Sequence, residues 1–368
     1  MTIRSRAAVA GSKGSFTIDN IQVSPPKGDE VLVKIKAAAL CHTDLDILNG
    51  NDFPHVMGHE GAGIIADIGP NVTDFKTGDP VVLNWAMHCG ACLACADKRI
   101  HLCENYSVAN GDGVSGHAHS EGTTYKGKPI RRSFYLGALS EYTIVRQSAV
   151  CKLHDKIPYS SASILSCGVM TGFGSAVNAA KVKPGSSVAV LGCGGVGINV
   201  VQGCRIAGAT RIIAIDITQK RLDQAKEFGA THGILSDPKD TTLASARDSI
   251  FALTHRGADY AFECTSIPTM ADAPLRFIRH GGMAVQVSGI EQPVNFDCSL
   301  FEWDKIYINP LYGQCNPKRD FAIMQDLYHT GELKLDEQIT KTYRLDELQH
   351  GFADMLSGKL AKGVVLFD

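Results

Sequence analysis

The sequence predicts an α/β protein with two domains, one built on a doubly wound parallel sheet and one rich in β-strands. The chain has 368 residues, which is too long for one ordinary hydrophobic core. Short strand patterns separated by turn signals fill its first part, and strands alternate with helices after Ser160. Such alternation is typical of a parallel sheet with helices on both faces.

The individual elements follow from periodicity and turn residues. In the first part, strands are expected at 31–37, 61–68 and 81–84. Further strands are expected at 187–191, 211–215, 260–263 and 283–287, with helices at 196–207 and 219–228. The end of the chain is expected to return to the first domain, with helices at 320–329 and 345–356 and a strand at 363–367. The stretch 105–132 lacks periodicity and predicts a long surface loop.

Composition and charge exclude several classes of protein. Hydrophobic residues make up 44% and charged residues 20%, with a formal net charge of −2, which is typical of a globular protein without a nucleic-acid or membrane partner. No run appears long and apolar enough to cross a bilayer. The N-terminus lacks the apolar stretch of a signal peptide, so a cytoplasmic protein is expected. In that compartment, twelve cysteines indicate metal ligation rather than disulfides.

A glycine motif of the form G-x-G-x-x-G includes Gly192, Gly194, Gly195, Val196 and Gly197. It follows a predicted strand and opens a predicted helix, so it is expected to hold a dinucleotide pyrophosphate. Asp216, 19 residues after Gly197, would accept hydrogen bonds from the adenosine ribose and repel a 2′-phosphate, which favours NAD over NADP. Lys220 and Arg221 weaken that preference. The alternative is a glycine turn without a ligand. It is disfavoured because the predicted strand, the predicted helix and the acidic residue all stand in their expected places.

Four cysteines within 15 residues predict a structural metal site, formed by Cys89, Cys92, Cys95 and Cys103. Four thiolates complete a tetrahedral Zn²⁺ site and leave no open position. An iron–sulfur cluster and four free thiols are weaker alternatives. A zinc ribbon for nucleic acid is disfavoured because the segment has no basic excess.

Three shorter motifs complete the pattern: Cys41-His42-Thr43-Asp44, Gly58-His59-Glu60 and Ser166-Cys167-Gly168. The ordered set of motifs resembles the zinc-containing medium-chain alcohol dehydrogenase family over essentially the whole chain. This set consists of the three short motifs, the four-cysteine segment, Thr171-Gly172, the glycine motif and Asp216. The resemblance implies a GroES-like catalytic domain formed by 1–168 and 312–368. It also implies a Rossmann NAD-binding domain at 169–311, with the active site in the cleft between the domains.

By this resemblance, Cys41, His59 and Cys167 bind a catalytic zinc and leave one position open for the substrate. Two zinc ions per subunit are therefore expected, one catalytic and one structural. Asp44 is expected to accept from the free N–H of His59. Glu60 lies beside the metal, where it balances charge or becomes a transient ligand; a buried structural carboxylate is the alternative for Glu60.

The resemblance also implies proton-relay and cofactor residues. Thr43 touches the substrate oxygen, and Asp46 stands where many relatives have the histidine that ends the relay, although a solvated loop acid is the alternative for Asp46. His42 and Lys362 stand where cations reach the pyrophosphate. Because His42 replaces a permanently charged arginine, looser NADH binding is expected. Further implied cofactor contacts are Thr171, Val196, Arg221 and Ser288.

Trp85, Tyr135 and Leu136 are expected on the substrate wall, which favours aromatic or allylic primary alcohols over short aliphatic ones. The sequence also resembles the glutathione-dependent formaldehyde dehydrogenase branch. Ser107 stands where that branch has an arginine, and the loop 50–58 is shorter than in that branch. Both departures argue against S-(hydroxymethyl)glutathione as the main substrate, so it is kept only as the alternative. Polyol dehydrogenases and zinc-free reductases of the family lack part of this ligand set. A non-catalytic NAD-binding protein with structural zinc is the alternative of a different class.

The resemblance implies a homodimer, with a tetramer as the alternative, in which the strand near 306–311 pairs with its copy. Pro310 is expected at the end or edge of that strand. Most of the remaining cysteines are expected to be small buried hydrophobes without chemistry.

Overall fold

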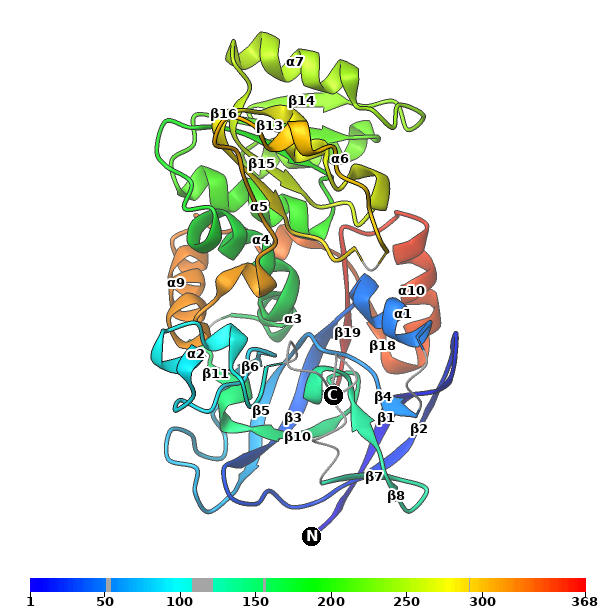
Figure 1. The fold of residues 1–368 in the computed structure, drawn as a ribbon. Coiled ribbons are helices and arrows are strands. Elements are labelled where there is room, and N and C mark those ends of the chain that lie inside the picture. The colour runs from blue at the N-terminus through cyan, green and yellow to red at the C-terminus, as the bar shows by residue number, and fades with distance from the viewer. Residues whose placement is uncertain (51–53, 108–121, 155–156, 291) are drawn as a thin grey trace. The chain divides into compact units, whose positions relative to one another are not determined.

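The computed structural model describes residues 1–50, 54–107, 122–154, 157–290 and 292–368. The chain divides into two compact units (Figure 1), one formed by Met1–Cys167 with Asn316–Asp368 and the other by Gly168–Cys315. The first unit is built from β-sheets, and the second contains a parallel sheet with helices. The predicted fold class is therefore confirmed.

The sheet of the second unit has the strand order β14-β13-β12-β15-β16-β17, and every paired neighbour runs parallel. Its strands are β12 (Ser187–Leu191), β13 (Arg211–Asp216), β14 (His232–Leu235), β15 (Ala258–Glu263), β16 (Ile278–Gln286) and β17 (Ile306–Ile308). The chain starts in the middle of the sheet and moves first to one side and then to the other. The order therefore reverses between β12 and β15, which is where a doubly wound sheet binds its ligand.

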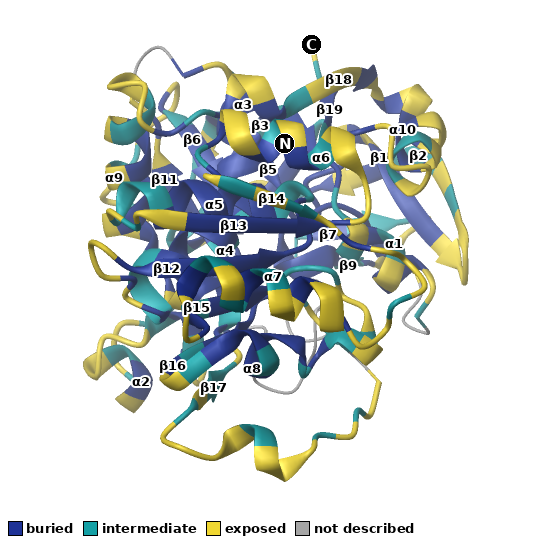
Figure 2. Ribbon diagram, turned by 90° about the horizontal axis from the view of Figure 1, so that it is seen from above, coloured by how far each residue is buried: buried dark blue, intermediate teal, exposed yellow. Residues whose placement is uncertain are grey.

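Successive side chains of β12 face opposite sides of this sheet and enter two separate cores. Val188 and Val190 pack in one core, whereas Ala189 and Leu191 pack in the other. The helices that supply the remaining core residues are α5 (Gly195–Ile206), α6 (Gln219–Glu227), α7 (Ala244–Thr254) and α8 (Ala273–Phe277). Because both faces are covered, β12 is buried along its whole length (Figure 2), which explains its continuous apolar sequence.

The first unit contains two sheets, with the orders β8-β7-β2-β1-β4-β9 and β11-β6-β5-β3-β19-β18, and β10 also pairs with β3. The long strands are β1 (Ile3–Ser12), β2 (Ser15–Val23), β3 (Glu30–Ala39), β5 (Gly61–Ile68), β10 (Tyr142–Arg146), β18 (Ile339–Arg344) and β19 (Lys362–Leu366). The short strands are β4 (His55–Val56), β6 (Pro80–Leu83) and β11 (Val150–Lys152). Because β19 pairs with β3, the end of the chain is an integral part of the first unit.

The helices of the C-terminal segment are α9 (Pro317–His329) and α10 (Leu348–Leu356). Asn316 caps α9 with its side chain, which accepts from the Arg319 amide, and Pro317 occupies the first turn. A proline is favourable there because its missing N–H would have no partner inside the helix.

The predicted surface loop 105–132 is wrong in its second half. Residues 108–121 lie outside the described part of the chain, but β7 (Thr123–Tyr125), β8 (Lys128–Pro129) and β9 (Arg131–Arg132) follow. Lys126 and Gly127 both have positive φ angles and form the turn of the β7–β8 hairpin, as two-residue hairpins require. Strands of two or three residues are too short to give a periodic sequence signal.

The expectation that no apolar run could span a bilayer also needs correction. One helical segment, Tyr159–Ala179, is long and apolar enough by composition, but 78% of its most apolar stretch is buried inside the protein. It consists of α3 (Tyr159–Ile164), the π-helical turn η5 (Leu165–Val169), α4 (Met170–Gly174) and the π-helical turn η6 (Ser175–Ala179). A helix that is apolar on all sides is typical of a protein core as well as of a membrane.

We predict that Gly58→Ala destabilises the protein by about 3 kcal/mol, because steric overlap adds to backbone strain. Gly58 has φ +95°, and a Cβ there would lie 2.3 Å from the Leu139 amide nitrogen. Gly78 is the matched control, since it has φ +94° but a Cβ there would have no atom within 4 Å. Urea unfolding of the two variants should differ by about 2 kcal/mol; equal losses would contradict the steric argument.

Candidate metal and cofactor sites

The first metal-binding candidate, Cys41, is positioned by the start of a helix. A short helix, α1 (His42–Leu48), begins directly after Cys41, which is its N-terminal cap residue. Asp44 lies in the first turn of α1 and is buried. An acidic residue is favourable in that turn, where the helix dipole is positive. The helix therefore places Cys41 and Asp44 close to one another.

Cys167 is positioned by the π-helical turn η5. π-Turns interrupt the regular spacing of an α-helix and are frequent at functional sites. The preceding residue, Ser166, accepts a hydrogen bond from the Gly61 amide at 3.0 Å and donates to the Ser163 carbonyl at 2.6 Å. Ser166 thus fixes this turn beside the segment that contains His59 and Glu60.

Four sequence-predicted residues meet in one cluster. The ligand atoms of Cys41, His59, Glu60 and Cys167 all lie within 4.8 Å of one another. His59 Nδ1 lies 2.9 Å from the Asp44 carboxylate, and both side chains are fully buried. His59 Nε2 is buried and has no hydrogen-bond partner among the described residues. When Nδ1 carries the proton, Nε2 presents a lone pair, so the donor set fits a metal ion.

The thiols and the imidazole strongly influence one another's protonation. The hydrogen bond with Cys167 holds the pKa of Cys41 well below its ordinary value, and the same contact raises the pKa of Cys167. Burial alone lowers the pKa of His59, but the charges of Asp44 and Cys41 outweigh it and raise that pKa well above its usual range. The cluster therefore favours one thiolate before any metal is bound, and thiolate is the form that binds metals.

Glu60 forms a buried ion pair in the same cluster. Its carboxylate lies 2.7 Å from Lys362 Nζ, and the side chains are 0% and 11% exposed, respectively. Burial raises the pKa of Glu60 to about 7, although Lys362 opposes this effect. Lys362 is the first residue of β19. The Lys362 ammonium pairs with Glu60 in the structure. Its expected role at the cofactor phosphates therefore remains a prediction.

Aromatic side chains border the cluster. The ring of Phe134 stacks on His59 with 4.5 Å between ring centroids and an interplanar angle of 27°. The ring centroid of Trp85 lies 5.2 Å from that of Phe134. Phe134 was not among the predicted residues. It and Tyr135 both adopt positive φ angles of 51° and 62°. Two consecutive residues with positive φ angles do not follow a helix or strand periodicity. The sequence pattern therefore does not indicate whether Phe134 or Tyr135 turns its ring toward His59.

The other predicted wall residues, Tyr135 and Leu136, are buried. Tyr135 also lines a surface pocket together with Met87, Tyr106 and Arg132. On α1, His42 and Asp46 are exposed, whereas Thr43 Oγ1 lies 3.6 Å from Cys41 Sγ. Among the predicted α1 residues, Thr43 and Asp44 therefore contact cluster residues directly.

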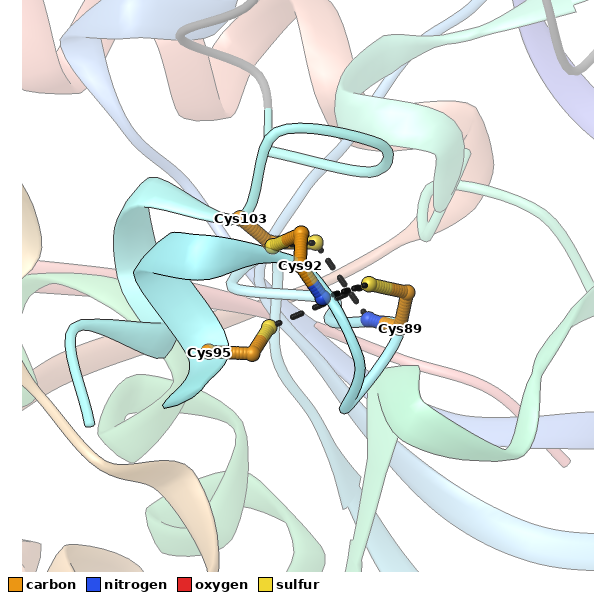
Figure 3. A group of neighbouring side chains, drawn as sticks. All are labelled: Cys89, Cys92, Cys95 and Cys103. Atoms are coloured by element: carbon orange, nitrogen blue, oxygen red, sulfur yellow. Dashed lines mark hydrogen bonds between the residues drawn. The ribbon is translucent and has the colours of Figure 1, made fainter. Parts of the chain in front are cut away.

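The four-cysteine segment forms a second cluster (Figure 3). Its four sulfur atoms all lie within 4.8 Å of one another. Backbone amides point at its sulfur atoms. The amides of Ala91 and Cys92 donate to Cys89 Sγ at 3.4 and 3.3 Å, and these bonds lower the pKa of Cys89 to about 6. The Glu104 amide donates to Cys92 Sγ at 3.4 Å. Amides placed around sulfur stabilise thiolates, so this set also fits a metal ion.

The glycine motif forms the turn between β12 and α5. Gly192 has φ +87°, and a Cβ at Gly197 would lie 1.8 Å from the Gly192 carbonyl oxygen. Gly194 is the N-terminal cap residue of α5, and a Cβ at that position would have no described atom within 4 Å apart from those of its own residue and its chain neighbours. The helix N-terminus is therefore open to an anion, as pyrophosphate binding requires. Val196 lies in the first turn of α5, next to Gly195.

Asp216 ends β13 beside the glycine turn. Its carboxylate accepts from the Cys193 amide at 2.9 Å and from the Thr218 amide at 3.0 Å. Arg221 approaches the same carboxylate at 3.8 Å. Thr171 lies on α4, and Ser288 follows β16.

The whole chain is similar to known zinc-dependent dehydrogenases. Residues 27–155 match the model of the alcohol dehydrogenase GroES-like domain, and residues 195–310 match that of the zinc-binding dehydrogenases. An alcohol dehydrogenase class-3 from Myxine glutinosa is 34% identical over 99% of this chain and 98% of its own length.

Two solved structures superpose over 100% of both chains. One is an alcohol dehydrogenase zinc-binding domain protein from Burkholderia ambifaria, with 32% identity and a TM-score of 0.92. The other is a benzyl alcohol dehydrogenase from Acinetobacter calcoaceticus, with 29% identity and a TM-score of 0.91.

We predict that Lys362→Met destabilises the protein by about 3–5 kcal/mol, because it leaves the Glu60 carboxylate buried without its partner. Lys341→Met is the matched control, since Lys341 pairs with Asp354 at 2.8 Å but is 55% exposed, and it should leave the unfolding midpoint near that of the parent. Adding Glu60→Gln to Lys362→Met should recover part of the loss in thermal unfolding. Similar midpoints for the two lysine variants would refute the argument.

Proposed function

The chain belongs to the zinc-dependent alcohol dehydrogenases of the medium-chain family, and we propose that it transfers hydride reversibly between NAD and a primary aromatic or allylic alcohol, giving the aldehyde. The zinc, the nicotinamide cofactor and the alcohol or aldehyde substrate follow from the family. One observation supports the residue roles best: Cys41 and Cys167 lie close to His59, whose buried Nε2 has no hydrogen-bond partner in the part of the chain that the structure describes.

Each residue of the cluster has a distinct role in this proposal. Bound zinc supplies the Lewis acidity that lowers the pKa of an alcohol, and NAD accepts the hydride. Cys41, His59 and Cys167 hold the metal, while Asp44 fixes the tautomer of His59. The Thr43 hydroxyl receives the proton of the alcohol. The exposed carboxylate of Asp46, one turn further along α1, passes it to water.

We propose two zinc ions per subunit, because the four-cysteine cluster offers a complete and separate ligand set. We also propose NAD rather than NADP as the cofactor. Asp216 places a buried negative charge at the end of β13, and an added 2′-phosphate would meet it. All twelve cysteines are free, which supports a reducing, cytoplasmic location.

The preference for aromatic or allylic alcohols rests on the rings beside the cluster. Phe134 stacks on His59, and Trp85 packs against Phe134 with an interplanar angle of 58°; aromatic rings of this kind pack well against planar apolar substrates. The likeness to a benzyl alcohol dehydrogenase agrees with this preference. For S-(hydroxymethyl)glutathione, Ser107 offers no cation to a substrate carboxylate, and its hydroxyl already donates to the His101 carbonyl at 2.8 Å.

The test of this function is the initial rate of NADH formation with benzyl alcohol, geraniol, ethanol, sorbitol, and formaldehyde with glutathione in separate assays. We expect kcat/KM for benzyl alcohol or geraniol to exceed that for ethanol by at least about tenfold, since a buried aromatic group adds about 1–3 kcal/mol of binding. Fastest turnover of formaldehyde with glutathione would replace the proposed substrate class, and fastest turnover of ethanol would reject it.

Two cysteine variants separate catalysis from folding in the same assay. Cys41→Ala should abolish turnover and remove one of two zinc equivalents measured by mass spectrometry. Cys204→Ala, which truncates a fully buried cysteine of α5, should retain both zinc and rate. Full activity of Cys41→Ala would contradict its assignment as a ligand.

We further propose that the protein is a homodimer formed through β17. This strand is one edge of the second unit's sheet. Its first residue, Ile306, is 48% exposed, and Trp303, shortly before it in the chain, is 67% exposed. An exposed apolar edge strand is a template for pairing with another copy. Pro310 lies beyond β17, at the start of a 3₁₀ turn, where it leaves the edge free.

We predict that Ile306→Lys converts the dimer to a monomer in light scattering after size-exclusion chromatography, since it places a charge in the apolar interface. Ile323→Lys is the control, because Ile323 is similarly exposed at 43% but lies on α9 of the other unit. The interface would be disproved if the parent protein were monomeric or if the Ile306→Lys variant stayed dimeric. A tetrameric parent would indicate a second interface in addition to this one.

A further inference from the structure

Glu263 is a fully buried carboxylate that has no part in the function described so far. It is the last residue of β15. One of its oxygen atoms accepts from the Thr265 amide at 2.5 Å and from the Thr265 hydroxyl. The other accepts from Gln286 Nε2 at 2.6 Å and from the Ser288 hydroxyl. Four donors on one buried group stabilise its charged form in place of water.

The position of Glu263 in the sheet relates it to one end of a dinucleotide. In a doubly wound sheet, the ligand lies at the carboxyl ends of the strands, across the point where the strand order reverses. Here β13, which ends at Asp216, lies on one side of β12, and β15 and β16 lie on the other. If Asp216 binds the adenosine ribose, the nicotinamide half reaches the ends of β15 and β16, where Glu263 and Gln286 are the last residues.

Glu263 fixes the loop that follows β15. Thr265 is held through both its amide and its hydroxyl, and its Cγ2 atom would be 2.8 Å from a Cβ at Gly192 in the glycine turn. The next residue, Ser266, has φ +61° and donates its amide to the Ser288 hydroxyl at 3.0 Å. A non-glycine residue in this conformation is costly and needs such support from its surroundings.

The orientation of Gln286 is fixed from the other side. Tyr307 on β17 places its hydroxyl 2.9 Å from Gln286 Oε1 and 3.1 Å from the Ala271 carbonyl oxygen. Burial raises the pKa of Tyr307 to about 12, so the hydroxyl keeps its proton near neutral pH. Nε2 of Gln286 faces Glu263 and also donates to the Ser288 carbonyl at 3.1 Å. A flip of the amide would turn Oε1 toward that carbonyl and toward the Glu263 carboxylate, so two acceptors would face each other. Each oxygen of Glu263 therefore meets one N–H whose direction is set by other contacts.

We propose that Glu263 is a positioning residue that holds Thr265 and Ser288 in the conformation that receives the nicotinamide half of the cofactor. This inference rests on the proposed function, since it requires a dinucleotide on this sheet. A glutamine at this position presents an NH₂ group to the Thr265 amide in one orientation and to the Gln286 amide in the other. In either case two donors face each other, and one of the two loops must move.

The experiment compares the affinities of NADH and ADP-ribose for Glu263→Gln by isothermal titration calorimetry. ADP-ribose contains everything in NADH except the nicotinamide. We expect the Kd of NADH to rise about tenfold or more and that of ADP-ribose to change less than about twofold, as the loss of hydrogen bonds to one charged group implies. The KM for NAD should rise in the same proportion, while bound zinc stays at the parent level.

Asp259→Asn is the matched control, because Asp259 lies near the other end of the same strand. It accepts from the Ser187 amide at 2.9 Å and from Arg279 Nε at 2.6 Å. This variant should lower the unfolding temperature without changing the ratio of the two affinities. If Glu263→Gln does not fold, Thr265→Val, which removes one hydroxyl donor, should shift the ratio in the same direction by a smaller factor.

The outcomes are distinct. Equal weakening of NADH and ADP-ribose would make Glu263 a residue of general stability and overturn the inference, as would an unchanged NADH affinity. A parent protein that binds neither ligand would overturn the proposed function itself, and the inference with it.

Discussion

The hydrogen bond between Asp44 and His59 is the constraint on which the catalytic unit depends. Both side chains are fully buried, and a buried carboxylate is tolerated only when hydrogen bonds or opposite charges replace its water. Asp44 is provided by the first turn of α1, which itself begins at Cys41. One short helix and its cap residue thus bring together a cysteine of the cluster and the carboxylate that orients His59. The orientation of His59 in turn leaves Nε2 facing the two thiols.

The rest of the first unit supports this arrangement through backbone contacts. The Glu60 carbonyl accepts from the Ala39 amide at 3.1 Å, and the Leu40 amide donates to the Gly363 carbonyl at 2.9 Å. These bonds join the end of β3, the segment before β5 and the start of β19. Lys362 enters the cluster because β19 pairs with β3. The last strand of the chain therefore supplies the only charge among the described ion pairs that offsets Glu60.

The second unit follows a different principle, in which polar groups gather where buried strands end. β12, β13 and β15 are almost wholly apolar in their interiors, whereas Asp216 and Glu263 stand at the carboxyl ends of β13 and β15. Both carboxylates are satisfied largely by neighbouring backbone amides and hydroxyls. This arrangement places polar groups beside the glycine turn without interrupting either core, because backbone amides at strand ends have no partners within the sheet.

The sequence by itself determined the fold class, four strands of the parallel sheet (β12, β13, β15 and β16) and the two sets of cysteine and histidine residues, whereas β14 has no counterpart among the predicted strands. Those features depend on local periodicity or on short motifs, and β12 and β5 begin and end where the pattern predicts. The tertiary structure alone decided that Phe134 stacks on His59, that Lys362 meets Glu60, and that Glu263 joins the end of β16 to the loops that follow β15 and β16. Residues 60 and 362 are far apart in the chain, and no local pattern encodes their pairing. The hairpin at 123–129 escaped prediction because its strands are stabilised by pairing with β2, not by a pattern of their own. Contacts of this kind depend on which strands become neighbours, and burial of the whole core, rather than any single segment, fixes that choice.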